Sequence, residues 1–300
     1  MSPGASIGEV LTAARRTLAA AGIPQPGLEA RLLLADTLGC EVAVLIGYPE
    51  RRLDPAVAAA MAQRVARRRC REPLAYILGR REFWSLSLRI DARTLVPRPD
   101  SETLIEAALA HAAGRRGLRV LDLGTGSGCL LLALLAELPD ARGIGVDISE
   151  AALGVAGANA EGLALDGRAA FVCGDWADAV AGVFDIVVSN PPYVADDEWA
   201  MLEEDVRGFE PVLALRGGAD GLDAYRRIVP TLPRLLASHG RAFIETGGAA
   251  AAGLPQLVVD SGMQVVGMRH DLEGRRRCLE IAGSALDGAK NFLGNQLVPV

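Results

Sequence analysis

From Asp100 onward, short apolar runs alternate with longer runs of helical periodicity. The runs expected to form strands are LRVLDL, GIGVD, AAFVC, FDIVVS, RAFIE, QVVGM and RCLEI. Helices are expected over 101–112, over CLLLALLAEL, and from Glu150 and Leu222. Strands that alternate with helices form a mostly parallel sheet covered on both faces. The pattern predicts an α/β fold with a doubly wound, seven-stranded, mostly parallel sheet, in which the short link between the last two strands makes at least one antiparallel.

The N-terminal quarter differs, because residues 5–70 show only helical periodicity. Asp54 followed by Pro55 is a typical helix start. Farther on, apolar residues alternate with polar ones between Trp84 and Ile90, which predicts a strand, paired in a hairpin with 94–96. We therefore expect an all-helical domain at 1–75, a β-hairpin linker at 76–99, the α/β domain at 100–283 and a tail without clear periodicity at 284–300.

Composition limits where the chain works and what it binds. Half of the residues are apolar, yet no run of about 18 uncharged apolar residues occurs, and the N-terminus lacks the apolar core of a signal peptide. The net charge of -6 argues against a stand-alone nucleic-acid binder, since such affinity comes mostly from Lys and Arg. We expect a monomeric cytoplasmic protein with no membrane association. Its cysteines suit reduced thiols rather than disulfides or zinc, and are Cys40, Cys70, Cys129, Cys173 and Cys278.

A glycine-rich loop joins the first predicted strand of the α/β domain to its helix. In VLDLGTGSGCLLLAL, Gly124, Gly126 and Gly128 let a ligand approach the backbone and the free N–H groups of the helix start. A dinucleotide fingerprint would place its third glycine at position 129, which is Cys129. The loop therefore disfavours NAD and FAD. A tight turn that only serves packing is the alternative.

Two more strand ends complete a nucleoside site. Asp147 ends GIGVD, where a carboxylate can accept hydrogen bonds from both ribose hydroxyls. Asp175 and Trp176 follow AAFVC, and a flat indole ring suits an adenine, although a Trp near a strand end can equally serve packing. Because carboxyl ends of parallel strands meet at one edge, these residues should lie close together.

The segment SNPPY follows the strand FDIVVS. Pro191 and Pro192 have no N–H for a sheet ladder, so the strand must end at Asn190, either in an ordinary turn or in a reactive site. A planar NH2 group must lose planarity to attack a methyl group, and acceptors can assist by holding its protons. The Asn190 side chain and the Pro191 carbonyl offer two such acceptors, and Tyr193 can wall the slot. These residues define a nucleophile class in which amide, adenine and cytosine stay open.

VLDLGTGSG, VDIS, GDW and SNPPY, taken in this order, resemble the strand-end motifs of class I S-adenosylmethionine-dependent methyltransferases, whose fold is Rossmann-like. The resemblance implies S-adenosyl-L-methionine as cofactor. It also implies a binding set of Gly124, Thr125, Gly126, Ser127, Gly128, Asp147, Trp176 and Asn190. Within it the glycine loop cradles the methionine part, Asp147 holds the ribose and Trp176 flanks the adenine.

PLAYILGRREFW, TLVPRPDSE and EPVLALRGGADGLDAYR resemble HemK-type peptide chain release factor glutamine N5-methyltransferases, over residues of about 5 to 283. The resemblance implies methyl transfer to the glutamine of the GGQ loop of class 1 release factors, and a substrate-docking role for the helical domain. It makes Asn190, Pro191 and Tyr193 catalytic and adds Pro192 to the glutamine site. The chain departs from the family at Ser101, where Thr is usual, and in IETGGAAA, where EIG is usual.

The alternatives are a methyltransferase for ribosomal protein L3, a DNA adenine methyltransferase and a non-catalytic donor-binding protein. L3 enzymes tend to carry PRSP where this chain has 97–100, and a DNA enzyme would need a basic groove. The arginines between 64 and 71 predict a solvated helix face or a contact with an acidic release-factor surface. Arg98 and Glu102 either border the glutamine slot or stabilise a helix start. The histidines are too dispersed for a metal site, and no metal is expected.

Overall fold

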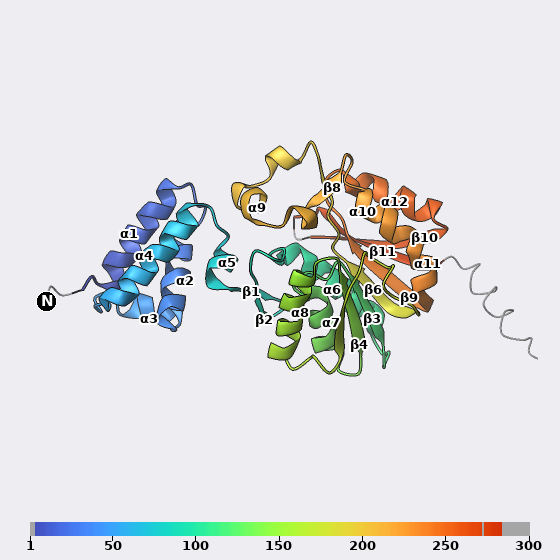
Figure 1. Ribbon diagram of the computed structural model, residues 1–300, viewed down its shortest axis with the longest axis horizontal. Helices are drawn as coiled ribbons and strands as arrows, with labels where there is room; N and C mark the ends of the chain where they lie inside the picture. Colours follow the sequence, from blue (N-terminus) through green and yellow to red (C-terminus); the bar gives the residue numbers. More distant parts are fainter. Residues whose placement is uncertain (1–3, 272, 284–300) are drawn as a thin grey trace, which may run out of the picture. The chain divides into compact units, whose positions relative to one another are not determined.

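The computed structural model describes residues 4–271 and 273–283, which form two compact units (Figure 1). The helical unit comprises the chain up to Arg80 together with Glu203–Phe209. The α/β unit comprises Arg81–Leu202 and the chain from Glu210 onward. The tail expected at 284–300 lies outside the described residues.

Local sequence signals start the helices of the helical unit. Ser6 and Glu9 form a capping box at the first helix: Ser6 Oγ accepts from Glu9 N at 3.3 Å, and Glu9 Oε2 accepts from Ser6 N at 2.7 Å. Asp54 caps a later helix by accepting from Ala56 N at 2.7 Å, as expected. The helices are α1 (Ile7–Ala20), α2 (Pro26–Leu38), α3 (Val42–Gly47), α4 (Pro55–Arg69), α5 (Leu74–Leu78) and α9 (Glu204–Phe209). Ile7, Leu18, Leu33, Leu45 and Met61 are among their buried contacts.

One arginine of α4 corrects the expectation of a solvated helix face. Arg68 is 4% exposed, and its guanidinium donates to Glu29 Oε2 at 2.5 Å and to Asp205 Oδ2 at 3.2 Å. Arg71 also reaches Asp205, at 3.3 Å, whereas Arg69 is exposed. A charge inside the unit needs such partners, because leaving water is costly. Arg68 therefore fastens α9, which is distant in sequence, to α2 and α4.

The partner expected for the strand before Ile90 is wrong. β2 (Leu86–Arg89) pairs with β1 (Arg80–Phe83), and not with 94–96. The two residues that join them, Trp84 and Ser85, have φ of +50° and +59°, the left-handed backbone of a two-residue hairpin turn. Neither residue is one that usually signals such a turn, so the sequence pattern concealed it.

The α/β unit contains the predicted seven-stranded sheet, in the order β10-β11-β9-β6-β3-β4-β5. Its strands are β3 (Arg119–Leu123), β4 (Arg142–Asp147), β5 (Ala169–Cys173), β6 (Phe184–Ser189), β9 (Leu236–Glu245), β10 (Met263–His270) and β11 (Arg276–Gly283). Within this sheet, the five neighbouring strands β9, β6, β3, β4 and β5 are parallel to one another. β11 pairs antiparallel with both β9 and β10. The expected mostly parallel sheet with at least one antiparallel strand is confirmed.

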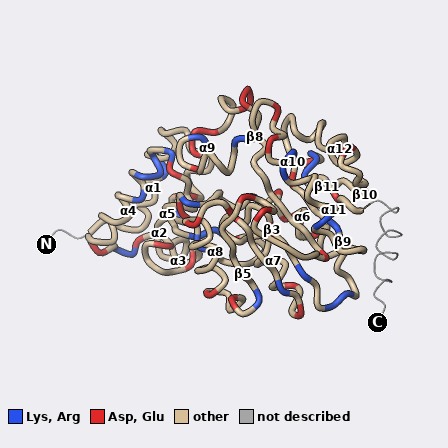
Figure 2. Tube along the Cα trace, turned by 45° about the vertical axis from the view of Figure 1, so that its right-hand side comes forward, with Lys and Arg blue, Asp and Glu red and all other residues tan. Residues whose placement is uncertain are grey.

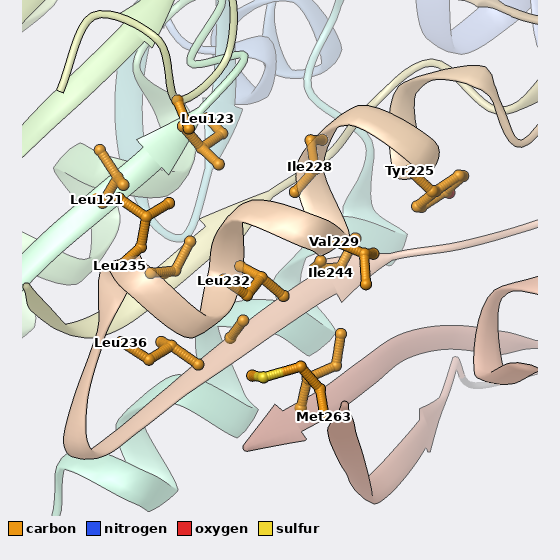
Figure 3. Close-up of a cluster of buried hydrophobic side chains, with 14 of the residues drawn as sticks. Leu121, Leu123, Tyr225, Ile228, Val229, Leu232, Leu235, Leu236, Ile244 and Met263 are labelled. Carbon is orange, nitrogen blue, oxygen red and sulfur yellow. The ribbon is translucent and has the colours of Figure 1, made fainter. Parts of the chain in front are cut away.

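Both faces of the sheet are covered, as alternation along each strand requires. On one face, a Cβ at Gly143 of β4 would meet Leu131 of α7, so α7 packs closely there. On the other face, Leu121 and Ile244 pack with Leu232 and Leu235 (Figure 3). The helical elements are η1 (Pro99–Ser101), α6 (Glu102–Ala112), α7 (Cys129–Glu137), α8 (Glu150–Gly162), α10 (Asp223–Ile228), η4 (Val229–Thr231), α11 (Leu232–Leu235) and α12 (Ala250–Asp260).

A short excursion follows β6. β7 (Val194–Ala195) pairs in parallel with β8 (Arg216–Gly218), and the short helices η2 (Trp199–Met201) and η3 (Val212–Ala214) lie between them in sequence. In the part of the chain that the structure describes, no helix is long and apolar enough to cross a membrane.

Candidate active site

The predicted site residues meet at the carboxyl edge of the parallel strands. Gly124 follows β3, Asp147 is the last residue of β4, Trp176 follows β5 and Asn190 follows β6. β3 lies between β4 and β6, and the chain continues from β3 to β4 on one side but from β6 to β9 on the other. Strand connections that leave in opposite directions open a crevice at this edge, where ligands of such folds bind.

A cavity of about 350 Å³ occupies this crevice within the α/β unit. The predicted residues that line it are Gly124, Thr125, Gly126, Ser127, Asp147, Trp176, Asn190 and Pro192. Gly128, Pro191 and Tyr193 are not among its lining residues. Its walls also include residues that lie outside the quoted motifs, such as Arg93 and Arg227.

The glycine loop needs glycine at its first position. Gly124 has φ of +75°, and a Cβ there would lie 3.1 Å from the Trp176 ring, so a side chain would push the indole away. Gly124 N and Thr125 N donate to the Val146 carbonyl at 2.8 and 2.9 Å. These two hydrogen bonds hold the loop against the end of β4.

Asp147 fixes the loop from the other side. Its Oδ2 accepts from Gly126 N at 2.8 Å and its Oδ1 accepts from Ser149 N at 2.9 Å. Each carboxylate oxygen has a second lone pair, so both can also accept a ligand hydroxyl. Asp147 lines the cavity and is thus placed to bind a diol.

Beneath the loop lies a buried acid that sequence reasoning missed. Asp122 in β3 is fully buried, and its Oδ2 accepts from Thr125 Oγ1 at 2.7 Å. Burial raises the pKa of Asp122 to about 7. Its Oδ1 has no hydrogen-bond partner, which is costly for a buried carboxyl oxygen. The signal was its place in VLDLG, two residues before the first glycine.

The Trp176 side chain lies between the protein core and the cavity. Its ring packs against the core cluster and also lines the cavity. The neighbouring Asp175 pairs with Arg227 of α10, with 2.8 Å between Oδ2 and Nη1. The indole is therefore held from its protein side while its cavity side can receive a flat ring.

The Asn190 side chain has a defined orientation. Its Nδ2 donates to Ser101 Oγ at 3.2 Å, and Ser101 Oγ donates to Glu245 Oε2 at 2.5 Å. Glu245 is the last residue of β9, the strand beside β6, so it reaches the same edge of the sheet. Sequence reasoning had noted Ser101 only as a departure from the family and had given Glu245 no role.

The residues after Asn190 lie deeper. Pro191 is buried, and the Tyr193 ring lies so close to Gly247 that a Cβ there would be 2.9 Å from it. Burial raises the pKa of the Tyr193 hydroxyl above its ordinary value. A neutral phenol therefore stands beside the site at physiological pH.

The linker residues are held by acids of the α/β unit. Arg98 Nη2 donates to Glu210 Oε1 at 2.5 Å, and Glu210 Oε2 accepts from Val96 N at 3.0 Å. Glu102 Oε1 accepts from Trp84 N at 3.0 Å. Glu102 thus ties the β1–β2 turn to the start of α6, in addition to lying in that helix's first turn.

Comparison with known proteins decides the family. The family model "PrmC N-terminal domain" matches residues 9–79, and "Methyltransferase small domain" matches 100–208. A release factor glutamine methyltransferase of Rhodospirillum rubrum is 46% identical over 91% of this chain and 84% of its own length. That of Cereibacter sphaeroides is 44% identical over 90% of this chain and 95% of its own length. This chain belongs to the release factor glutamine methyltransferase family.

The family assignment makes the protein a methyltransferase with S-adenosyl-L-methionine as cofactor. A solved structure, the hMettl16 catalytic domain in complex with MAT2A 3'UTR hairpin 6, has a TM-score of 0.55 and 20% identity, covering 80% of this chain and 84% of that one. At this identity the likeness supports the fold alone. The alternatives built on L3, DNA or a non-catalytic role are not favoured by these relatives.

The cavity's donor set fits a methyl-donor cofactor of this kind. It combines a carboxylate for a diol, an indole face for a base and loop glycines that admit close approach. In addition, the Asp122 carboxyl oxygen without a partner lies under the loop. Within residues 4–271 and 273–283, no group of three or more His, Cys, Asp or Glu residues could hold a metal ion.

Proposed function

We propose that this protein transfers a methyl group from S-adenosyl-L-methionine to the side-chain amide nitrogen (N5) of the glutamine in the GGQ motif of class 1 peptide chain release factors. The observation that carries the proposal is the oriented Asn190 amide at the wall of the cavity. Relatives with 40–46% identity carry the name release factor glutamine methyltransferase, which supports the choice of substrate.

The reaction requires an amide nitrogen to become nucleophilic. Bound S-adenosylmethionine supplies an electrophilic methyl group on a sulfonium. Asn190 Oδ1 and the Pro191 carbonyl each accept one N–H of the substrate amide, and their dipoles stabilise the positive charge that develops on nitrogen. Pro192 limits the conformations of the backbone that carries the second acceptor, and Tyr193 borders the slot. No strong base is needed, since the proton can leave after transfer.

The cofactor would be held by the loop from Gly124 to Gly128 and by two side chains. Asp147 accepts from the ribose hydroxyls and Trp176 stacks on the adenine. Thr125 and Ser127 are part of this loop and line the cavity. Asn190 joins the cofactor site and the glutamine site, because it must stand beside the methyl group.

The helical unit is proposed to dock the release factor. We assign this role to residues 1–75, with 76–99 as linker and 100–283 as the methyltransferase domain. Glu203–Phe209 follows SNPPY in sequence yet groups with the helical unit. The polypeptide chain therefore connects the proposed docking unit directly to the segment that follows Asn190. Charges of both signs are scattered along the trace in Figure 2, and the net charge of -6 favours a protein over a nucleic acid as substrate.

We further propose that the enzyme works as a monomer in the cytoplasm. The dispersed cysteines fit a reducing compartment. That all lining residues of the cavity come from one unit of a single chain supports the monomer proposal.

The function is tested by incubating the protein with a class 1 release factor and S-adenosylmethionine carrying a labelled methyl group. We expect label in the release factor, located at the GGQ glutamine by peptide mass spectrometry, and none after Gln→Ala in that motif. Label that persists in the altered release factor, or that appears only in ribosomal protein L3, would overturn the proposal.

Asp147→Ala should weaken S-adenosylmethionine binding about tenfold to a hundredfold, because hydrogen bonds to a charged carboxylate are lost. Calorimetric titration of the cofactor measures this. Asp166→Asn, which neutralises an exposed acid after α8, is the charge-matched control and should leave affinity unchanged. Equal affinities of the Asp147→Ala variant and the wild type would remove Asp147 from the cofactor site.

A further inference from the structure

Three side chains from distant parts of the sequence form a buried line that ends at the cavity. Glu245 is 1% exposed and does not line the cavity; Ser101 is 2% exposed and, like Asn190, does line it. The two hydrogen bonds of 2.5 and 3.2 Å connect Glu245 to Ser101 and Ser101 to Asn190. Glu245 is therefore connected to the cavity by hydrogen bonds through the serine hydroxyl.

Counting protons fixes the direction of both bonds. A carboxylate only accepts hydrogen bonds, and a serine hydroxyl has a single proton to donate. When Glu245 is ionised, that proton goes to Glu245, and Ser101 Oγ can only accept from Asn190. The Asn190 NH2 group must then face Ser101, which leaves Oδ1 on the opposite side of the planar amide, free to accept from a ligand.

Protonation of Glu245 allows the donor and acceptor roles in both hydrogen bonds to be exchanged. A protonated carboxyl can donate to Ser101 Oγ, which releases the serine proton for Asn190 Oδ1. The amide can then turn over and present its NH2 group instead of its oxygen to the substrate NH2, and two donors facing one another cannot hydrogen-bond. One buried proton thus decides whether the site offers an acceptor or a donor.

We propose that Glu245 and Ser101 are positioning residues that orient the Asn190 amide, so that methyl transfer is switched on when Glu245 is ionised and off when it is protonated. The proposal rests on the proposed function, because it assigns Asn190 Oδ1 to the substrate amide. It also gives the serine at position 101 a chemical task that any hydroxyl side chain there can perform.

The surroundings of Glu245 place this switch near neutral pH. Burial raises the pKa of Glu245 to about 7, although the Ser101 hydrogen bond and the charges of Arg277 and Arg98 act in the opposite direction. The titratable and charged groups around it are Arg98 and Asp100 before α6, Cys129 in α7, Tyr193 after β6, Tyr225 in α10, and Arg277 and Cys278 in β11. The pKa values of the two cysteines and the two tyrosines are all raised, away from neutrality.

The kinetic test measures kcat for release-factor methylation at saturating substrates from pH 5.5 to 8.5. In the wild type, kcat should fall about tenfold for each pH unit below about 7, because the protonated form is inactive. Glu245→Gln, which cannot ionise, should remove this dependence. Ser101→Ala should remove it and lower kcat about tenfold at pH 8, whereas Ser101→Thr should restore both kcat and its pH dependence.

Asp122→Asn is the matched control. Asp122 is the other buried carboxyl of the site whose pKa is raised to about 7, but it bonds Thr125 and not Ser101. This variant should keep the pH dependence of kcat. A dependence that disappears in Asp122→Asn and persists in Glu245→Gln would overturn the assignment to Glu245.

A second readout needs no methyl transfer. The sequence has four asparagines, Asn159, Asn190, Asn291 and Asn295, so selective 15N-asparagine labelling yields few side-chain NH2 signals, and Asn190→Ala identifies the one from Asn190. Its NH2 resonances should shift through a transition near pH 7 in the wild type, with or without S-adenosylmethionine, and not in Glu245→Gln. A resonance that stays unchanged in the wild type contradicts the switch.

The two measurements separate this proposal from the proposed function. If release factor is methylated but neither kcat nor the Asn190 resonance follows Glu245, the switch is wrong and the function stands. If no release factor is methylated but the Asn190 resonance titrates in the wild type and not in Glu245→Gln, the orienting contact stands and the assigned substrate is wrong.

Discussion

Asn190→Ala should lower kcat for glutamine methylation by about 10²- to 10³-fold, which corresponds to roughly 3 to 4 kcal/mol of transition-state stabilisation. The alanine removes the acceptor that holds one substrate N–H while charge develops on nitrogen. It leaves the Pro191 carbonyl as the remaining acceptor, so a residual rate should persist. Single-turnover transfer of a labelled methyl group to a release factor measures the step directly, free of product release.

Two controls separate chemistry from folding in this variant. The unfolding midpoint of Asn190→Ala should stay close to that of the wild type, since the residue lies at the cavity wall and only part of its side chain is buried. Asn190→Asp keeps the shape of the side chain but cannot donate to Ser101, so its kcat should also fall, by about tenfold. Near-normal turnover in both variants would mean that the amide only shapes the turn.

The sequence was most informative where each feature is a short local signal. Gly124, Asp147 and Asn190 each follow or end an apolar strand, and the carboxyl ends of parallel strands meet at one edge whatever their distance along the chain. The grouping of these residues in one site could therefore be predicted without knowledge of the strand order. The sheet and the cavity at its carboxyl edge were predictable for this reason.

Contacts between sequence-distant polar residues were not predictable in the same way. Ser101 and Glu245 are 144 residues apart, and their bond depends on β9 lying beside β6, which no periodicity encodes. A retrospective signal exists for Glu245, because it ends the strand RAFIE at the same edge as Asn190. The turn at Trp84 and Ser85 was missed for another reason, since the alternation of apolar and polar residues from Trp84 to Ile90 begins within the turn, which contains no glycine or asparagine.

Arg68 shows the limit of reading charge from helical position. In sequence it is one of several arginines in α4, and runs of this kind are usually solvated. Its partners, Glu29 and Asp205, lie 39 and 137 residues away. Their presence turns a surface-like residue into a buried cross-link of the helical unit.

Arg68→Met should accordingly lower the free energy of unfolding of the helical unit by about 3 to 5 kcal/mol, because it removes one partner of a buried ion pair and leaves a carboxylate without compensation. Asp205 retains Arg71 at 3.3 Å, so Glu29, whose side chain is 14% exposed, is the carboxylate left in deficit. Adding Glu29→Gln to Arg68→Met should therefore recover part of the loss. Arg69→Met, at an exposed position of the same helix, should change stability by no more than about 0.5 kcal/mol.

The distribution of tryptophans allows the two units to be followed separately in the full chain. Trp84, Trp176 and Trp199 all belong to the α/β unit, so their fluorescence reports on that unit alone. Hydrogen exchange of amides in α1, α2 and α4 reports on the helical unit, and exchange in Glu203–Phe209 reports on the segment that Arg68 fastens. Arg68→Met should accelerate exchange in both sets of amides and leave the fluorescence transition unchanged. An equal loss in both units, or unchanged exchange in Glu203–Phe209, would show that Arg68 does not act as a local cross-link.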